Sequence, residues 1–94
     1  MGYTNRSDIL AWTEANIKQA PEVCGVYILR PADQSIGYIG SAGAMRLRAR
    51  LLEHWNDNDH PRTRYFDWYQ TESEAAAREL EQAWIRRYKP PWNG

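Results

Sequence analysis

The sequence predicts an α+β fold in which a three-stranded antiparallel sheet is flanked by helices. Two strand-like runs, 23–30 and 35–40, are separated only by the turn residues 31–34, which is the pattern of a hairpin. A third run, 64–70, alternates in the manner of a strand, and segments of helical periodicity lie before the hairpin and on both sides of this run. With 94 residues, the chain is expected to form a single domain.

The first element is expected to be a helix, with Ser7 as its N-cap and its end near Gln19, before Pro21. We expect residues 1–22 to form an N-terminal helical extension that packs on one face of the sheet. Residues 23–94 would then form the domain proper.

The hairpin carries two short tripeptides, GVY at 25–27 and YIG at 38–40. If the turn has four residues, Tyr27 lies directly opposite Tyr38, and both phenols occupy one face of the sheet. Hairpin loops of neighbouring lengths are almost as common, so other registers stay open.

The next helix is predicted from about Ala44 to Trp55, because apolar residues recur there at spacings of three and four. On a helical wheel, Arg50 and His54 border the apolar stripe, whereas Arg48 lies on its far side. The alternative for an arginine beside such a stripe is a surface residue that packs its aliphatic stem and keeps its charge in water.

The last helix is predicted to open with a capping box formed by Thr71 and Glu74, and to end before Pro90. Its wheel turns Glu81 toward the buried side. An unpaired buried carboxylate is costly, so a metal ion, an arginine or backbone donors must compensate it. A structural ion pair with an arginine, either Arg50 or Arg86, is as plausible on this basis as a metal site.

Composition limits the partners and the compartment. Twelve basic residues balance twelve acidic ones, which argues against nonspecific attraction to nucleic acid, so any DNA contact must use a local basic patch or a partner. The single cysteine, Cys24, excludes an internal disulfide and fits a reducing compartment. The sequence has no bilayer-length apolar stretch and no leader at its start, so we expect a cytoplasmic protein with no membrane partner.

Taken in order, these motifs resemble the GIY-YIG nuclease domain family over residues 23–94. The second tripeptide matches the family signature, and the first matches with Val26 in place of isoleucine. The helical family pattern Leu-x-x-Arg-x-x-x-His is matched by Leu47, Arg50 and His54. The later pattern, a glutamate, an aliphatic residue and a Pro-x-x-Asn ending, is matched by Glu81, Ile85, Pro90 and Asn93.

The resemblance implies a divalent-metal-dependent DNA endonuclease that hydrolyses phosphodiester bonds. Glu81 would hold one Mg²⁺ or Mn²⁺ ion, and Arg50 would stabilise phosphate charge. Tyr27 is the candidate general base, while Tyr38 and His54 would hydrogen-bond the attacking water or relay a proton. Whether Tyr27 or His54 takes that proton is open.

Further residues are expected around this site. Substrate contacts are expected from Ser41, Arg46 and Arg48, and structural support from Gly25, Gly40 and Asn93. The interval before Arg50 is longer than is common in the family, so Arg48 competes for its role. The sequence shows no targeting domain, so specificity would come from a partner or a dimer. The alternative function is an inactive nucleic-acid-binding or protein-interaction module of the same fold.

Overall fold

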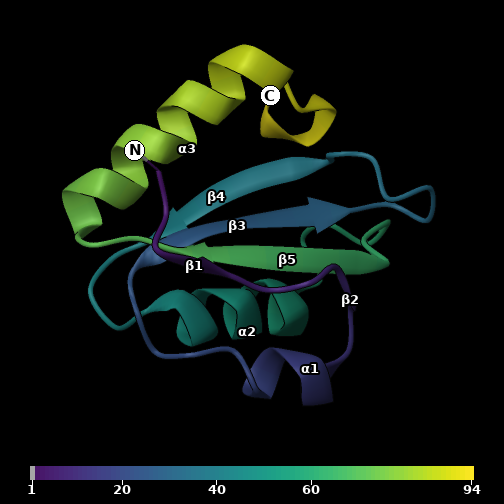
Figure 1. The fold of residues 1–94 in the computed structure, drawn as a ribbon. Coiled ribbons are helices and arrows are strands. Elements are labelled where there is room, and N and C mark those ends of the chain that lie inside the picture. Colours follow the sequence, from purple (N-terminus) through teal and green to yellow (C-terminus); the bar gives the residue numbers. More distant parts are fainter. Residues whose placement is uncertain (1) are drawn as a thin grey trace.

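The computed structural model describes residues 2–94, in which one antiparallel sheet is covered by helices on both faces (Figure 1). The elements in chain order are β1 (Asn5–Arg6), β2 (Leu10–Ala11), α1 (Glu14–Lys18), β3 (Gly25–Arg30), β4 (Tyr38–Ala42), α2 (Leu47–Asp57), β5 (Tyr65–Gln70), α3 (Glu74–Tyr88) and the 3-10 turn η1 (Pro91–Asn93). None of the helices in the described part of the chain is long and apolar enough to cross a membrane.

The predicted α+β class is confirmed, and β3, β4 and β5 form the expected antiparallel core. The strand order is β1-β5-β3-β4, and β2 also pairs with β5, so the sheet has five strands where three were expected. Both additional strands are two residues long and come from the N-terminal segment. They cover the side of β5 that would otherwise expose unpaired backbone groups.

The predicted start of the N-terminal helix at Ser7 is wrong, whereas its end near Gln19 is confirmed. The Ser7 backbone N–H donates to the Trp68 carbonyl, and the Ser7 hydroxyl accepts from the Trp68 N–H at 3.0 Å. A helix of only five residues follows, and Thr13 is its N-cap, accepting from the Asn16 N–H at 3.2 Å. A short helix gains little by itself, whereas extended residues complete hydrogen bonds along β5.

The predicted hairpin register is also wrong, by two residues. Tyr27 pairs with Gly40, and Tyr38 pairs with Leu29, because the connecting loop runs over 31–37. Side chains alternate between faces with a period of two, so this shift leaves both phenols on one face. Their ring centroids lie 6.3 Å apart.

The two faces of the sheet carry separate apolar cores. Leu29 and Phe66 pack with Leu47 and Leu51 of α2 on the face that α1 and α2 cover. Val26, Ile28, Ile39 and Ala77 pack on the other face, which α3 covers. As an edge strand buried by helices on both faces, β4 supplies side chains to both cores.

The helix boundaries differ modestly from the prediction. Helix α2 begins at Leu47 instead of Ala44, because Met45 has a left-handed backbone with φ 57°. The N-cap of α3 is Ser73, whose hydroxyl accepts from the Ala76 N–H at 3.0 Å, so the predicted capping role of Thr71 is wrong. The Thr71 hydroxyl instead donates to the Ser73 carbonyl.

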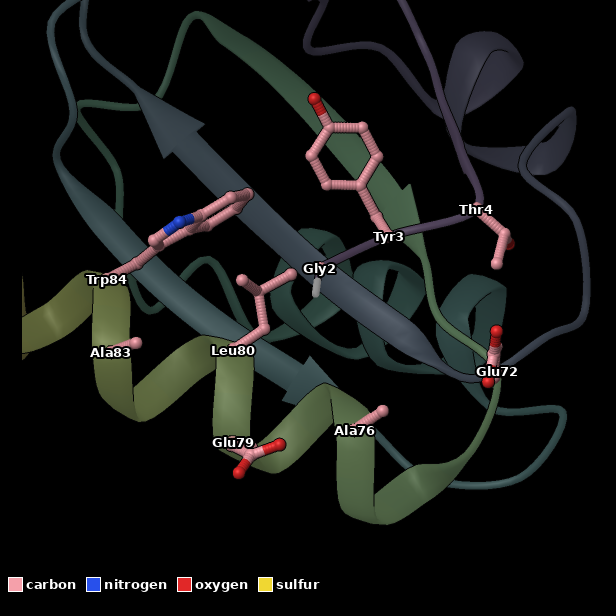
Figure 2. Close-up of a pocket in the computed structure, with 9 residues that line it drawn as sticks. All are labelled: Gly2, Tyr3, Thr4, Glu72, Ala76, Glu79, Leu80, Ala83 and Trp84. Atoms are coloured by element: carbon pink, nitrogen blue, oxygen red, sulfur yellow. The ribbon is translucent and has the colours of Figure 1, made fainter.

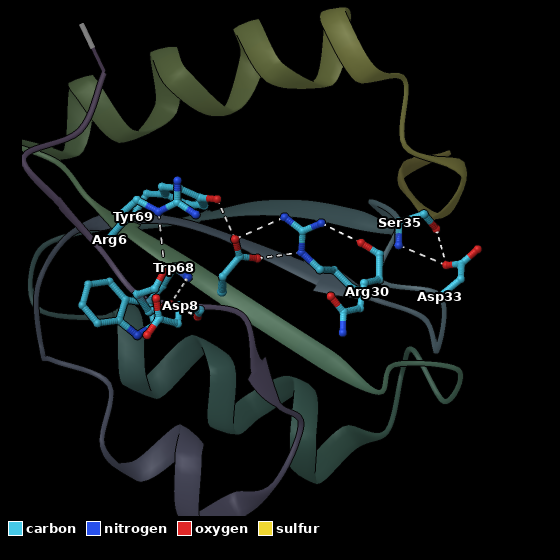
Figure 3. A network of polar contacts seen from close by, with 10 residues as sticks. Arg6, Asp8, Arg30, Asp33, Ser35, Trp68 and Tyr69 are labelled. Atoms are coloured by element: carbon cyan, nitrogen blue, oxygen red, sulfur yellow. Dashed lines mark hydrogen bonds and ion pairs between the residues drawn. The ribbon is translucent and has the colours of Figure 1, made fainter.

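A closed polar network lies between the sheet and α3. Asp67 of β5 is 0% exposed, and both of its oxygens accept from the Arg30 guanidinium, at 2.9 and 3.2 Å. The Tyr69 hydroxyl donates to the same carboxylate. Figure 3 shows how Arg30 extends this network to the loop that holds Asp33 and Ser35. The three partners compensate one another, as a buried charge requires.

Candidate active site

Two glycines of the sheet, Gly25 and Gly40, leave room for neighbouring groups that a side chain would displace. A Cβ atom on Gly40 would lie 2.5 Å from the Tyr27 hydroxyl, because the Tyr27 ring packs across the opposite strand at this point. A Cβ atom on Gly25 would lie 2.2 Å from the Tyr69 carbonyl oxygen of β5. Both glycines therefore have a steric reason to be present, while their support of the site stays a prediction.

The phenols of β3 and β4 meet the imidazole of His54 from α2. The Tyr27 hydroxyl lies 2.8 Å from His54 Nε2, and the Tyr38 ring centroid lies 5.5 Å from that of His54. The structure thus brings three of the predicted site residues into one cluster. Tyr27 is 0% exposed, whereas Tyr38 is only partly buried. Of the two phenols, Tyr38 is therefore the one that solvent reaches.

Two members of this cluster were missed by the sequence analysis. His54 Nδ1 lies 2.9 Å from both oxygens of Asp59, and the His60 ring lies 4.4 Å from that of Tyr38. Asn58 ends α2 in a left-handed conformation, with φ 50°, and turns the chain back toward His54. An asparagine directly after an amphipathic helix is a usable signal for such a reversal.

The side chains of His54, Asp59 and His60 place one potential metal ligand each within 4.8 Å of the others. Ligands about 2.0–2.1 Å from a tetrahedral ion would lie about 3.3 Å apart. The distance from His54 Nδ1 to Asp59 is 2.9 Å, which suits a direct hydrogen bond better. We therefore treat these residues as a hydrogen-bonded cluster.

Arg50 lies one turn before His54 on α2 and acts on both phenols. Burial raises the pKa of Tyr27, and the Arg50 charge opposes this effect without cancelling it. Burial also raises the pKa of Tyr38, again against an opposing effect of Arg50. The Arg50 guanidinium is itself paired with Glu53, which also binds Arg46 at 2.7 Å. Arg50 is thus an oriented positive charge beside two neutral phenols.

Arg48 is not brought into this cluster. Its Nε donates to the Ala20 carbonyl at 2.7 Å, and its guanidinium lies 3.9 Å from the Glu22 carboxylate. The side chain therefore ties α2 to the segment that follows α1. Of the two arginines that competed for the phosphate role, Arg50 is the one beside the phenols.

Glu81 approaches β4 from the other face of the sheet. It is partly buried on α3, and its Oε1 accepts from the Ser41 hydroxyl at 2.8 Å. Within residues 2–94 Glu81 forms no ion pair, neither with Arg50 nor with Arg86. The carboxylate is still close enough to the phenol cluster that its charge adds to the raised pKa of Tyr38.

The donor set at Glu81 fits a hard divalent cation. A carboxylate and a serine hydroxyl are oxygen ligands, which Mg²⁺ and Mn²⁺ prefer. Because no arginine or lysine within the described residues neutralises Glu81, its charge is available to an ion. Mg²⁺ usually keeps several waters, so a single protein carboxylate suffices.

Asn93 fastens the end of the described chain to the edge strand. Its side-chain amide accepts from the Ile39 N–H at 2.8 Å and donates to the Ile39 carbonyl at 2.9 Å. The Trp92 N–H adds a bond to the Gly37 carbonyl. Asn93 is therefore anchored next to Tyr38, as the sequence led us to expect.

A separate hollow of about 750 Å³ lies between the N-terminal arm and α3 (Figure 2). The residues that line it are Gly2, Tyr3, Thr4, Glu72, Ala76, Glu79, Leu80, Ala83 and Trp84. None of the predicted site residues is among them. The chemistry at β4 is thus separate from this hollow.

Comparison with known families gives one match that spans most of the chain. A family model described as the UvrC-like GIY-YIG domain matches residues 23–94. The resemblance seen in the sequence is thereby confirmed over the same residues.

Curated relatives carry the name UvrABC system protein C. The protein from Corynebacterium jeikeium is 40% identical over 78 residues, and that from Acidothermus cellulolyticus is 37% identical over 84 residues. These alignments cover 73% and 80% of this chain. They cover only 11% and 13% of the relatives, so the chain spans a small part of their length.

Solved structures agree with this assignment. The crystal structure of the GIY-YIG N-terminal endonuclease domain of UvrC from Thermotoga maritima, bound to its catalytic magnesium, is 29% identical and has a TM-score of 0.74. The match covers 85% of this chain and 93% of that one. A point mutant of the same domain, bound to its catalytic divalent cation, matches with a TM-score of 0.72 at 28% identity, over 83% of this chain and 90% of that one.

Proposed function

Because the chain belongs to the family of UvrC-like GIY-YIG domains, we propose that it is a divalent-metal-dependent endonuclease that hydrolyses phosphodiester bonds in DNA. The observation that carries this proposal is Glu81, a partly buried carboxylate with no cationic partner in the described residues. A carboxylate in this state favours binding of a cation.

Glu81 would hold one Mg²⁺ or Mn²⁺ ion, with Ser41 fixing the position of its carboxylate. When bound, the ion would supply positive charge to a nonbridging oxygen and to the leaving oxygen of the phosphodiester. The solved Thermotoga maritima domain that this chain resembles is bound to magnesium.

Arg50 would stabilise the negative charge that builds up on the phosphate during attack. Its planar guanidinium suits two phosphate oxygens at once, and Glu53 holds it in place from one side. Arg46 shares the Glu53 carboxylate and is half exposed, so it would contact the DNA backbone nearby. Arg48 has a structural role in this arrangement.

The attacking water would hydrogen-bond to Tyr38. The resemblance makes Tyr27 the candidate general base, with His54 as the open alternative, but Tyr27 is fully enclosed, so a water cannot reach its hydroxyl from solvent. Tyr38 is more accessible and lies beside it. Tyr27 and His54 would support Tyr38 from the buried side.

Specificity for a DNA site would come from a targeting partner or a second copy of the chain. The charges of this sequence are balanced, so its general attraction to DNA is weak. We also propose a cytoplasmic location, which the free Cys24 fits.

The decisive experiment is cleavage of supercoiled plasmid. We expect nicking with Mg²⁺ or Mn²⁺, none with a chelator, and a loss of roughly 100-fold or more in Glu81→Ala. Glu79→Ala is the matched control, because Glu79 is exposed on the same helix, and it should cleave normally.

Plasmid binding without nicking under every metal condition would contradict the endonuclease. That outcome would favour the alternative, a DNA-binding module of the same fold. Equal nicking by the Glu81 and Glu79 variants would show that the metal site lies elsewhere.

A further inference from the structure

Asp59 reaches the buried cluster from the loop after α2. The left-handed Asn58 closes the helix with a bond from its N–H to the His54 carbonyl at 2.9 Å. This reversal brings the Asp59 carboxylate against the ring of His54, while about half of its side chain stays in solvent. No resemblance or comparison described above gives this residue a role.

The contacts of His54 determine which ring nitrogen carries its proton. A carboxylate can only accept, so Nδ1, at 2.9 Å from both oxygens of Asp59, must be the protonated nitrogen. In neutral imidazole Nε2 is then an acceptor, and the hydroxyl of Tyr27 at 2.8 Å must donate to it. Asp59 therefore determines that His54 donates to Asp59 and that Tyr27 donates to His54.

The direction matters because of what lies beyond Tyr27. The Arg50 guanidinium, which has donors only, acts on the Tyr27 hydroxyl and opposes the rise of its pKa. If Tyr27 donates to His54, the lone pairs of its oxygen stay free and face a positive field from Arg50. If His54 carried its proton on Nε2 instead, Nε2 would donate to the Tyr27 oxygen and use one of those lone pairs.

We propose that Asp59 is a positioning residue that holds His54 in its Nδ1–H tautomer and thereby makes the Tyr27 hydroxyl the donor to His54. This proposal rests on the proposed nuclease function, in which Tyr27 and His54 support Tyr38. Asp59 acts only through His54 and Tyr27. The side chains around His54 are Tyr27 of β3, Tyr38 of β4, and Asp59 and His60 of the following loop, and Arg50 lies one turn before it on α2.

The tautomer can be measured without DNA or metal. Long-range proton–nitrogen NMR spectra of ¹⁵N-histidine-labelled protein, recorded with a chelator, report which nitrogen of each imidazole is protonated. A His54→Gln sample distinguishes His54 from His60. We expect Nδ1–H for His54 in the wild type and Nε2–H in Asp59→Asn, because the new amide can donate to Nδ1.

The matched control is Asp57→Asn, since Asp57 is an exposed residue at the end of the same helix and should keep the wild-type tautomer. In plasmid cleavage, Asp59→Asn should lower kcat about 10- to 100-fold with little change in KM. Asp59→Glu should recover part of that loss, because it retains a carboxylate, which can only accept.

Two failures can be told apart. If the wild-type protein does not cleave DNA, the proposed function is contradicted, and so is the role of Asp59 in cleavage. If the wild type cleaves DNA but His54 is protonated on Nε2, or if Asp59→Asn cleaves like Asp57→Asn, the role of Asp59 alone is overturned.

Discussion

Asp67 and Glu81 are carboxylates that both lie between the sheet and α3, yet their surroundings are opposite. Asp67 is 0% exposed and accepts from the guanidinium of Arg30 and the hydroxyl of Tyr69. Glu81 is less buried, and it accepts from one neutral hydroxyl, that of Ser41. The more deeply buried acid is therefore the compensated one.

This difference shows that burial alone does not identify a catalytic carboxylate. A closed network such as that of Asp67 leaves no oxygen for an ion and stabilises structure. A carboxylate without a cationic partner retains its attraction for one. The two residues should therefore respond to mutation in different measurements.

The largest expected effect on folding is that of Asp67→Ala. The change leaves the guanidinium of Arg30 buried without its counter-charge, and this should lower the free energy of unfolding by about 3–5 kcal/mol. Urea unfolding followed by tryptophan fluorescence measures the loss. Glu81→Ala should cost less than about 1 kcal/mol in the same assay. Similar losses of unfolding free energy in the two variants would contradict the distinction between a structural Asp67 and a metal-binding Glu81.

A smaller effect is expected at Ser41, which holds the Glu81 carboxylate. Ser41→Ala should raise the Mg²⁺ concentration for half-maximal nicking roughly tenfold, because residues that orient a metal ligand typically have effects of this size. Ser41→Thr retains the hydroxyl and serves as the control. An unchanged Mg²⁺ dependence in Ser41→Ala would mean that the serine does not support the ion.

The smallest effect concerns pH and the closed network. Burial, together with the bond to Asp67, raises the pKa of Tyr69 to about 12. Between its ordinary pKa near 10 and this value, the folded protein keeps a proton that the unfolded chain loses, so stability should fall as pH rises. Urea unfolding between these two pH values should show that the free energy of unfolding falls less steeply with pH in Tyr69→Phe than in the wild type.

Tyr88→Phe is the control for this measurement, because Tyr88 is 46% exposed and lies outside the network. Its stability should fall with pH as steeply as that of the wild type. Part of the slope should remain in Tyr69→Phe, because the pKa of Tyr27 is also raised by burial. Identical slopes for the wild type and Tyr69→Phe would contradict the role of Tyr69.

The sequence predicted the core of the fold because its signals there are local. Alternation identified β5, and helical periodicity identified α2 and α3. The register of Tyr27 against Tyr38 depended on loop length, which the sequence does not fix, but an error of two residues preserves the face. The prediction for the segment before β3 failed because pairing with β5, a strand far along the chain, decides the conformation of that segment.

The same distinction applies to the polar residues. Helical periodicity singled out Arg50, His54 and Glu81 as candidates because each lies at a defined angle on a helix. Asp59 was missed because its contact depends on the backbone of the preceding residue. Asp67 was missed because an acid that alternates with Tyr65 and Tyr69 on a strand can equally face solvent, and only the packing of α3 buries it.

The bonds between Asn93 and Ile39 also bear on how copies of the protein meet in concentrated solution. An outermost strand with free amide and carbonyl groups invites a neighbouring molecule to extend the sheet. Asn93 already occupies both peptide groups of Ile39 on β4, and Trp92 occupies the carbonyl of Gly37 just before the strand. The hydrogen bonds of Asn93 should therefore also disfavour self-association through the exposed edge of β4.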